Sequence, residues 1–146
     1  MEELRMSELK LAISNIAWDK ADDEAVYAAM QQNGFTGLEI APTRIFPEYP
    51  YENLTGAALF GGYLLNRWGF HVPSMQSIWY GQTGNIFDPV QAEELLDYTA
   101  EAFQFAHTIN CPSLVFGCPK TAAWTRRTPR RRRCLFCQGR CAGVPL

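Results

Sequence analysis

The order of its predicted elements places this chain in the α/β class, with parallel strands. Short apolar runs alternate with helix-length segments between residues 9 and 120, and glycine, proline and acidic residues mark the boundaries. Strands that alternate with helices form parallel sheets through right-handed crossovers. With 146 residues and 47% hydrophobic content, one domain of this size buries about 68% of its unfolded surface.

The first strand–helix unit covers residues 9–34. Leu9 to Ile16 run apolar toward their end, which predicts a short buried strand. Asp22 to Glu24 supply the capping and negatively charged residues that favour a helix N-terminus. Apolar residues then recur at helical spacing, and Gly34 stands where a left-handed helix end is expected. A helix from about residue 22 to 33 follows from these signals.

A second strand is predicted from Phe35 to Ala41, and Pro42 ends it. Glu39 near its end is a candidate functional residue, because a buried carboxylate needs a partner or a ligand. An ion pair with a nearby arginine is the alternative, and the two explanations are weighted equally. Residues 43–53 are rich in proline and aromatic residues, which predicts a long loop with a functional role.

The remaining units follow the same alternation. Thr55 is expected to cap a helix through about Trp68, and residues 70–78 are predicted to form a third strand. After a loop over residues 79–87, Asp88 as N-cap, Pro89 at the first helical position and Gln91 in a capping box mark the clearest helix start. Pro112 ends that region, and residues 113–117 are expected to form a fourth strand.

Ligands of parallel sheets collect at the carboxyl ends of the strands. Polar side chains follow these ends here, and they suit a small polyhydroxylated ligand. Amide and carboxylate oxygens accept from hydroxyls, Arg44 suits an anionic group, and Trp18 or Phe87 suits a sugar face. The predicted substrate-binding residues are Asn15, Trp18, Glu39, Arg44 and Gln76.

Four motifs in this order resemble the sugar phosphate isomerase/epimerase family, the xylose-isomerase-like TIM barrels. The resemblance covers about residues 9–120, and its motifs are Ile13–Trp18, Gly37–Arg44, Met75–Trp79 and Leu114–Lys120. It implies a partial (β/α)8 barrel of about four strand–helix units. A full barrel takes about 250 residues, so residues 9–120 would be its N-terminal half, preceded by an extension over residues 1–8.

The resemblance also implies an activity. The family carries out aldose–ketose isomerisation or epimerisation by proton transfer beside a carbonyl, assisted by a divalent metal such as Mn, Mg, Co or Zn. Its metal ligands come from strands in the second half of the barrel. We therefore expect this chain to hold no metal by itself and to lack independent activity, and its catalytic residues stay unassigned. A non-catalytic sugar-binding fragment is the alternative.

Residues 121–146 differ in composition from the rest of the chain. All 15 acidic residues precede residue 120, whereas eight of the 13 basic residues lie at or after it, six of them between Arg126 and Arg133. An arginine run predicts nucleic-acid binding. The AP-endonuclease branch of the same superfamily would need a metal-binding histidine where this chain has Gln76. Nucleic acid is therefore not the expected partner.

The cysteines at 134, 137 and 141 suggest a metal site but lack a fourth nearby ligand. We expect instead a disordered tail produced by a frameshift, because codons chosen for residues 130–138 yield an acidic, helix-forming sequence in another frame.

Half a barrel would expose strand edges and self-associate through them. The longest apolar run, residues 57–65, is too short to span a membrane, and the acidic N-terminus predicts a cytoplasmic protein.

Overall fold

The computed structural model describes residues 10–116 and Thr121. The predicted N-terminal extension and the basic tail beyond Thr121, with its arginine run and three cysteines, lie outside the described residues. So does the end of the predicted fourth strand after Phe116.

The first strand–helix–strand unit is confirmed, and its two strands are parallel. Its first strand, however, is largely exposed and not buried as predicted. β1 (Ala12–Ser14) pairs with β2 (Gly37–Glu39) in the register Ala12 to Gly37 and Ser14 to Glu39. A 3-10 turn, η2 (Lys20–Asp22), leads into α1 (Asp23–Gln32). Gly34 follows the helix with a φ of +75°, a conformation that costs glycine little.

The middle of the chain differs from the sequence prediction at two places. Residues 43–45, predicted as the start of a loop, form with Pro42 the short helix α2 (Pro42–Ile45), because a proline at the first position already has a helical φ. The next helix, α3 (Leu54–Tyr63), continues into a π-helical turn, η3 (Leu64–Trp68), as far as predicted. Its N-cap is Asn53, whose side chain accepts from the Gly56 N–H, and not Thr55.

The predicted third strand is only partly formed. It lies parallel to β2, with isolated bridges from Gly37 to His71 and from Ile40 to Met75. The Leu38 and Ile40 N–H groups donate to the carbonyls of His71 and Ser74. These acceptors are three residues apart, whereas the donors are two apart, so the third segment contains one extra residue at this point. This extra residue, with the missing N–H of Pro73, interrupts the ladder. Residues 113–115 reach Met75 through a further parallel bridge at Leu114.

The longest helix, α4 (Pro89–Thr108), begins where the sequence predicts. The Asp88 side chain accepts from the N–H groups of Val90 and Gln91, which confirms it as the N-cap. The reciprocal bond of a capping box is replaced, because the Asp88 N–H donates to the Asn85 carbonyl. The side chains that α4 buries recur at helical spacing: Ala92, Leu95, Thr99, Ala102, Phe105 and Ala106.

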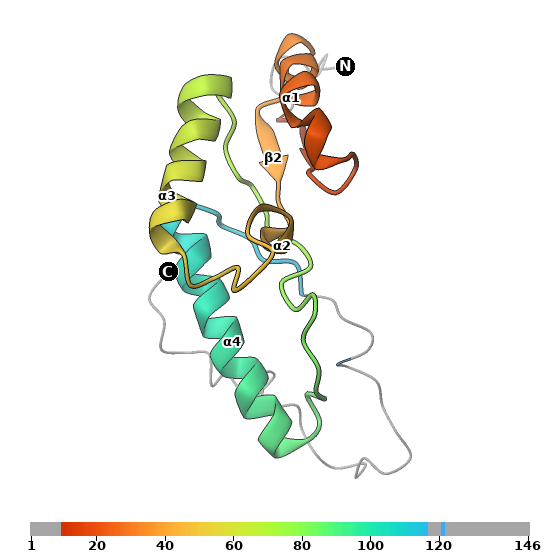
Figure 1. Cartoon of the computed structure of the whole chain (residues 1–146), viewed down its shortest axis with the longest axis vertical. Helices are drawn as coiled ribbons and strands as arrows, with labels where there is room; N and C mark the ends of the chain where they lie inside the picture. Colours follow the sequence, from red (N-terminus) through yellow and green to blue (C-terminus); the bar gives the residue numbers. More distant parts are fainter. Residues whose placement is uncertain (1–9, 117–120, 122–146) are drawn as a thin grey trace, which may run out of the picture.

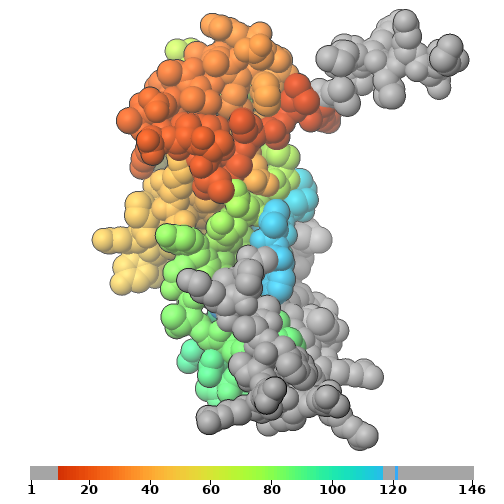
Figure 2. Space-filling model, turned by 90° about the vertical axis from the view of Figure 1, so that its right-hand side faces the viewer, coloured from red at the N-terminus to blue at the C-terminus, as the bar shows by residue number. Residues whose placement is uncertain are grey.

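These elements form a mixed α/β fold with a two-stranded parallel sheet and four α-helices in the described part of the chain. α3 packs against α4, and α1 packs against η3 (Figure 1). Figure 2 shows the elongated outline, with the β1–α1 region at one end and α4 toward the other. The fully buried side chains that join the layers include Leu38, Ile40, Leu64, Phe70, Met75 and Phe105.

Candidate functional site

Asn15 fixes the carboxyl ends of the two strands relative to each other. It lies directly after β1 and is fully buried. Its N–H donates to the Glu39 carbonyl at 2.9 Å, and its Oδ1 accepts from the Ala41 N–H at 2.8 Å. Among the described residues, its Nδ2 has no hydrogen-bond partner. The structure therefore gives Asn15 a role in holding the loops after β1 and β2 together.

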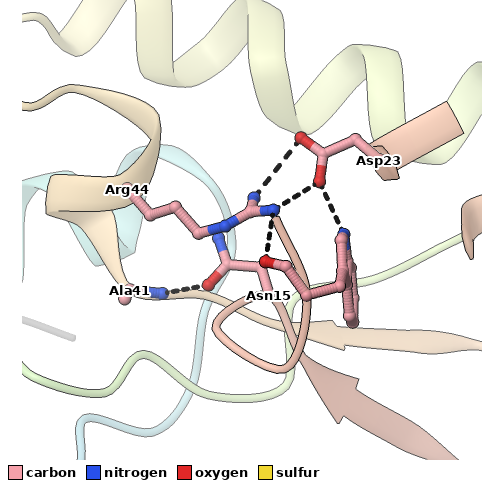
Figure 3. Close-up of polar contacts among 5 residues, drawn as sticks. Asn15, Asp23, Ala41 and Arg44 are labelled. Atoms are coloured by element: carbon pink, nitrogen blue, oxygen red, sulfur yellow. Dashed lines mark hydrogen bonds and ion pairs between the residues drawn. The ribbon is translucent and has the colours of Figure 1, made fainter. Parts of the chain in front are cut away.

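An ion pair crosses this end of the sheet. The Arg44 guanidinium, on α2, donates to both carboxylate oxygens of Asp23, at 2.7 and 3.3 Å, and to the Trp18 carbonyl at 3.2 Å. The Trp18 indole N–H donates to the same carboxylate at 2.8 Å. The guanidinium also lies over the indole ring, 5.6 Å from its centroid. Figure 3 shows Arg44 and Asp23 facing each other beside the Asn15–Ala41 hydrogen bond.

A cavity of about 770 Å³ opens beside this ion pair. Trp18 and Arg44 line it, together with hydroxyl, amide and aromatic side chains from α2, from α4, and from the loops that follow α2 and residue 76. These further residues include Thr43, Tyr49, Ser77, Tyr80, Gln82 and Tyr98. The cavity therefore combines aromatic surface with hydrogen-bonding groups, which is the usual composition of a small-molecule site.

Two of the cavity's lining residues have a strained backbone. Tyr49 has a φ of +49° and Ser77 a φ of +54°. Residues other than glycine rarely adopt this region, and such strain is concentrated at functional sites. It therefore supports the assignment of this cavity as the candidate site.

Glu39 and Gln76 belong to a second polar group, formed between the strands themselves. Glu39 accepts from the Ser74 hydroxyl at 2.6 Å, and the Gln76 amide donates to the Ser14 hydroxyl at 2.6 Å. The register of the β1–β2 pair places Ser14 opposite Glu39, so the Glu39–Ser74 and Gln76–Ser14 hydrogen bonds are neighbours. The alternative ion pair for Glu39 does not involve Arg44, because Arg44 is held by Asp23.

The structure thus brings two of the five predicted binding residues, Trp18 and Arg44, to the cavity. Asn15, Glu39 and Gln76 are not among its lining residues, and neither is Phe87. Asp23 was predicted only as part of a helix start, although it organises the site. The cavity tyrosines were not predicted individually, although the aromatic loop at residues 43–53 was expected to be functional.

Two tyrosines in contact with each other lie at the site, Tyr51 buried and Tyr98 partly buried. The Tyr51 hydroxyl donates to the Ile78 carbonyl at 2.8 Å, and its ring meets the Tyr98 ring edge-on at 5.0 Å. Burial raises the pKa of both phenols, with the nearby Tyr98 adding to the effect at Tyr51. Both therefore stay neutral at physiological pH and serve as hydroxyl groups and aromatic surface.

Tyr27 predicts a loss of stability at high pH. Burial, reinforced by the Asp23 charge, raises the pKa of Tyr27 from 10.0 to about 12. The unfolded chain releases this proton near pH 10 while the folded chain keeps it, so the free energy of unfolding falls between pH 10 and about 12. Urea unfolding across this range is expected to show a smaller decline for Tyr27→Phe. Tyr80→Phe, which alters an exposed tyrosine, should show the same decline in the free energy of unfolding as the unaltered chain. Equal declines for the unaltered chain and both variants would contradict the assignment of this pH dependence to Tyr27.

Two further observations bear on the kind of protein. In the described part of the chain, no three His, Cys, Asp or Glu side chains are grouped closely enough to hold a metal ion. None of the described helices combines the length and apolar character needed to cross a membrane.

No model of a protein family, no curated protein and no solved structure matches this chain. The residues of the cavity are therefore the basis for assigning its ligand.

Proposed function

We propose that this chain binds a small sugar or sugar phosphate in the cavity at the carboxyl ends of β1 and β2. The observation that carries the proposal is the composition of that cavity. The Tyr49 and Tyr80 rings supply apolar faces suited to the C–H surface of a sugar, while Ser77 and Gln82 supply groups that exchange hydrogen bonds with its hydroxyls. A volume of about 770 Å³ is ample for a monosaccharide.

The arrangement of the backbone supports a finer proposal about the fold, a partial (β/α)8 barrel. β1, β2 and the segments around Met75 and Leu114 lie side by side in chain order, and every bridge between them is parallel. The first half of such a barrel has this order, and barrel enzymes bind their substrates at the carboxyl ends of the strands. The candidate cavity lies at this end.

The proposed reaction class of the full-length family is aldose–ketose isomerisation or epimerisation. A divalent metal would polarise the substrate oxygens there during proton transfer. Because the resemblance assigns the metal ligands to later strands of the barrel, we propose that the present chain binds the sugar without converting it. Its own residues would position the sugar: Tyr80 by ring contact, Gln82 and Ser77 by hydrogen bonding.

Sugar titrations with a cavity variant test the binding. Tyr80→Ala removes an exposed lining ring, and we expect it to weaken binding of monosaccharides roughly five- to ten-fold by calorimetry. Leu59→Ala is the matched control, because Leu59 is equally exposed, at 71%, but lies on α3 outside the cavity lining. Equal weakening by both changes, or no binding by the unaltered chain, would contradict the proposed site.

The reaction class has its own test. The chain is incubated with an aldose and added Mg²⁺ or Mn²⁺ in heavy water, where proton transfer beside the carbonyl would place deuterium on the sugar. We expect no exchange and no ketose. Conversion by this chain alone would overturn the proposal that it binds without catalysing.

A further inference from the structure

The positively charged side chain at the cavity is already paired with a carboxylate of the chain itself. Of the side chains that line it in the described part of the chain, Arg44 alone is cationic. Its guanidinium makes two charge-assisted bonds to Asp23 and one bond to the Trp18 carbonyl (Figure 3). The exposed side-chain fractions of Arg44 and Asp23 are only 15% and 24%, so water screens the pair weakly. The site therefore presents a neutralised pair instead of a free cation.

The position of Trp18 strengthens this arrangement. Its indole N–H donates to the Asp23 carboxylate, and its ring lies against the guanidinium. Asp23 is thus held by two partners and Arg44 by three groups. A phosphate approaching Arg44 would find three of its five N–H donors already engaged and would meet the negative charge of Asp23 at close range. Like charges brought together at a binding interface strongly disfavour association.

The other polar groups of the cavity are uncharged. Thr43, Ser77, Tyr80 and Tyr98 carry hydroxyls, and Gln82 carries an amide. Groups of this kind both donate and accept, so they match sugar hydroxyls, which also do both. A dianionic phosphate accepts only, and it is usually bound by arginine clusters or helix N-termini.

We infer that the ligand of this cavity is an uncharged sugar or polyol, and that Asp23 sets this preference by neutralising Arg44. The inference rests on the proposed sugar-binding function and narrows its ligand class. Asp23 acts here as a specificity-determining residue through Arg44, with no contact to the ligand required.

Matched ligand pairs test the inference on the full chain. Glucose, fructose and ribose are each titrated against their own phosphate ester by calorimetry at one fixed ionic strength. We expect each neutral sugar to bind at least about ten-fold more tightly than its ester. Tighter binding of the esters would overturn the inference while sugar binding stands. Absence of binding by all six ligands would instead overturn the proposed function.

Asp23→Asn gives the decisive variant, because it keeps the shape and an oxygen for Trp18 and Arg44 but removes the charge. We expect it to raise the affinity for the phosphate esters about five-fold or more and to change that for the neutral sugars less than about two-fold. Unchanged ester affinity in a variant with native circular dichroism would overturn the role of Asp23. Asp19→Asn, at an exposed acid directly before η2, is the control and should alter neither affinity. The ligand pairs on the unaltered chain decide the ligand class independently of this variant.

Discussion

Replacing Phe105 with alanine is expected to lower the free energy of unfolding by about 3–5 kcal/mol, because it empties the centre of the core. Phe105 is fully buried on α4. Its ring meets Phe46 edge-on at 6.0 Å and Tyr51 at 5.6 Å, which ties the helix to the loop between α2 and α3. Urea unfolding followed by circular dichroism measures the loss.

Val90→Ala is the control for Phe105→Ala. Val90 lies on the same helix and is 71% exposed, and we expect its truncation to alanine to change the free energy of unfolding by less than about 0.5 kcal/mol. Similar losses for the two variants would show that the α4 face carrying Phe105 does not form the core contact described above.

Removal of the Asp23 carboxylate is the second large effect. Asp23→Ala leaves the Arg44 guanidinium without its ion pair and the Trp18 N–H without its acceptor. Breaking a fully buried pair costs about 3–5 kcal/mol, and the partial exposure of this one reduces the expected loss of unfolding free energy to about 2–3 kcal/mol. Chemical denaturation of the variant measures it.

A double-mutant cycle separates the pair from its surroundings. Arg44→Ala and the double variant complete the cycle with Asp23→Ala, and we expect a coupling energy of about 1–2 kcal/mol between the two side chains. Asp19→Ala serves as the control, because the Asp19 side chain makes no capping hydrogen bond to the turn that follows it. A coupling energy near zero would mean that the charges do not act as the pair described.

Sequence reasoning was most reliable where a signal and its structural result lie within one turn of chain. Asp88 and Pro89 predict the start of α4, and Asp88 caps it. Gly34 predicts a left-handed residue after α1, and its φ is +75°. Both signals act through local backbone geometry and need few long-range contacts. A local signal can still be misplaced by a few residues, because Asn53 and not Thr55 caps α3. The predicted alternation is confirmed only in part: the β1–α1–β2 unit forms, whereas α2 is an additional helix and the described parts of the third and fourth predicted strands form only isolated bridges.

Reasoning from the sequence failed where neighbouring segments decide the outcome. Residues 70–78 have the composition of a strand, yet the extra residue opposite β2 and the missing N–H of Pro73 leave only isolated bridges there. The need for glycine at position 37 also depends on neighbouring segments. A Cβ at this position would lie 2.9 Å from the Ala12 Cβ and 3.2 Å from the Pro73 Cγ. Both distances depend on how three segments meet.

The candidate site shows the same division. Trp18 and Arg44 were predicted from residue type and from their place after the strands, and both line the cavity. The role of Asp23 was not predicted, because it is 21 residues from Arg44 and serves equally well as a helix-start residue in the sequence. Asn15 was predicted to contact substrate, whereas its buried side chain holds the Ala41 N–H.

By itself, the sequence determined the first strand–helix–strand unit, the capping residue that starts α4, and the presence of polar and aromatic residues after the strands. Tertiary structure alone decided which of those residues share a cavity, and that Asp23 neutralises Arg44 there. The physical reason is the sequence separation of the residues that interact. Capping and turn formation act between residues a few positions apart, whereas the charge and shape of a site depend on side chains that meet only when separate segments pack together.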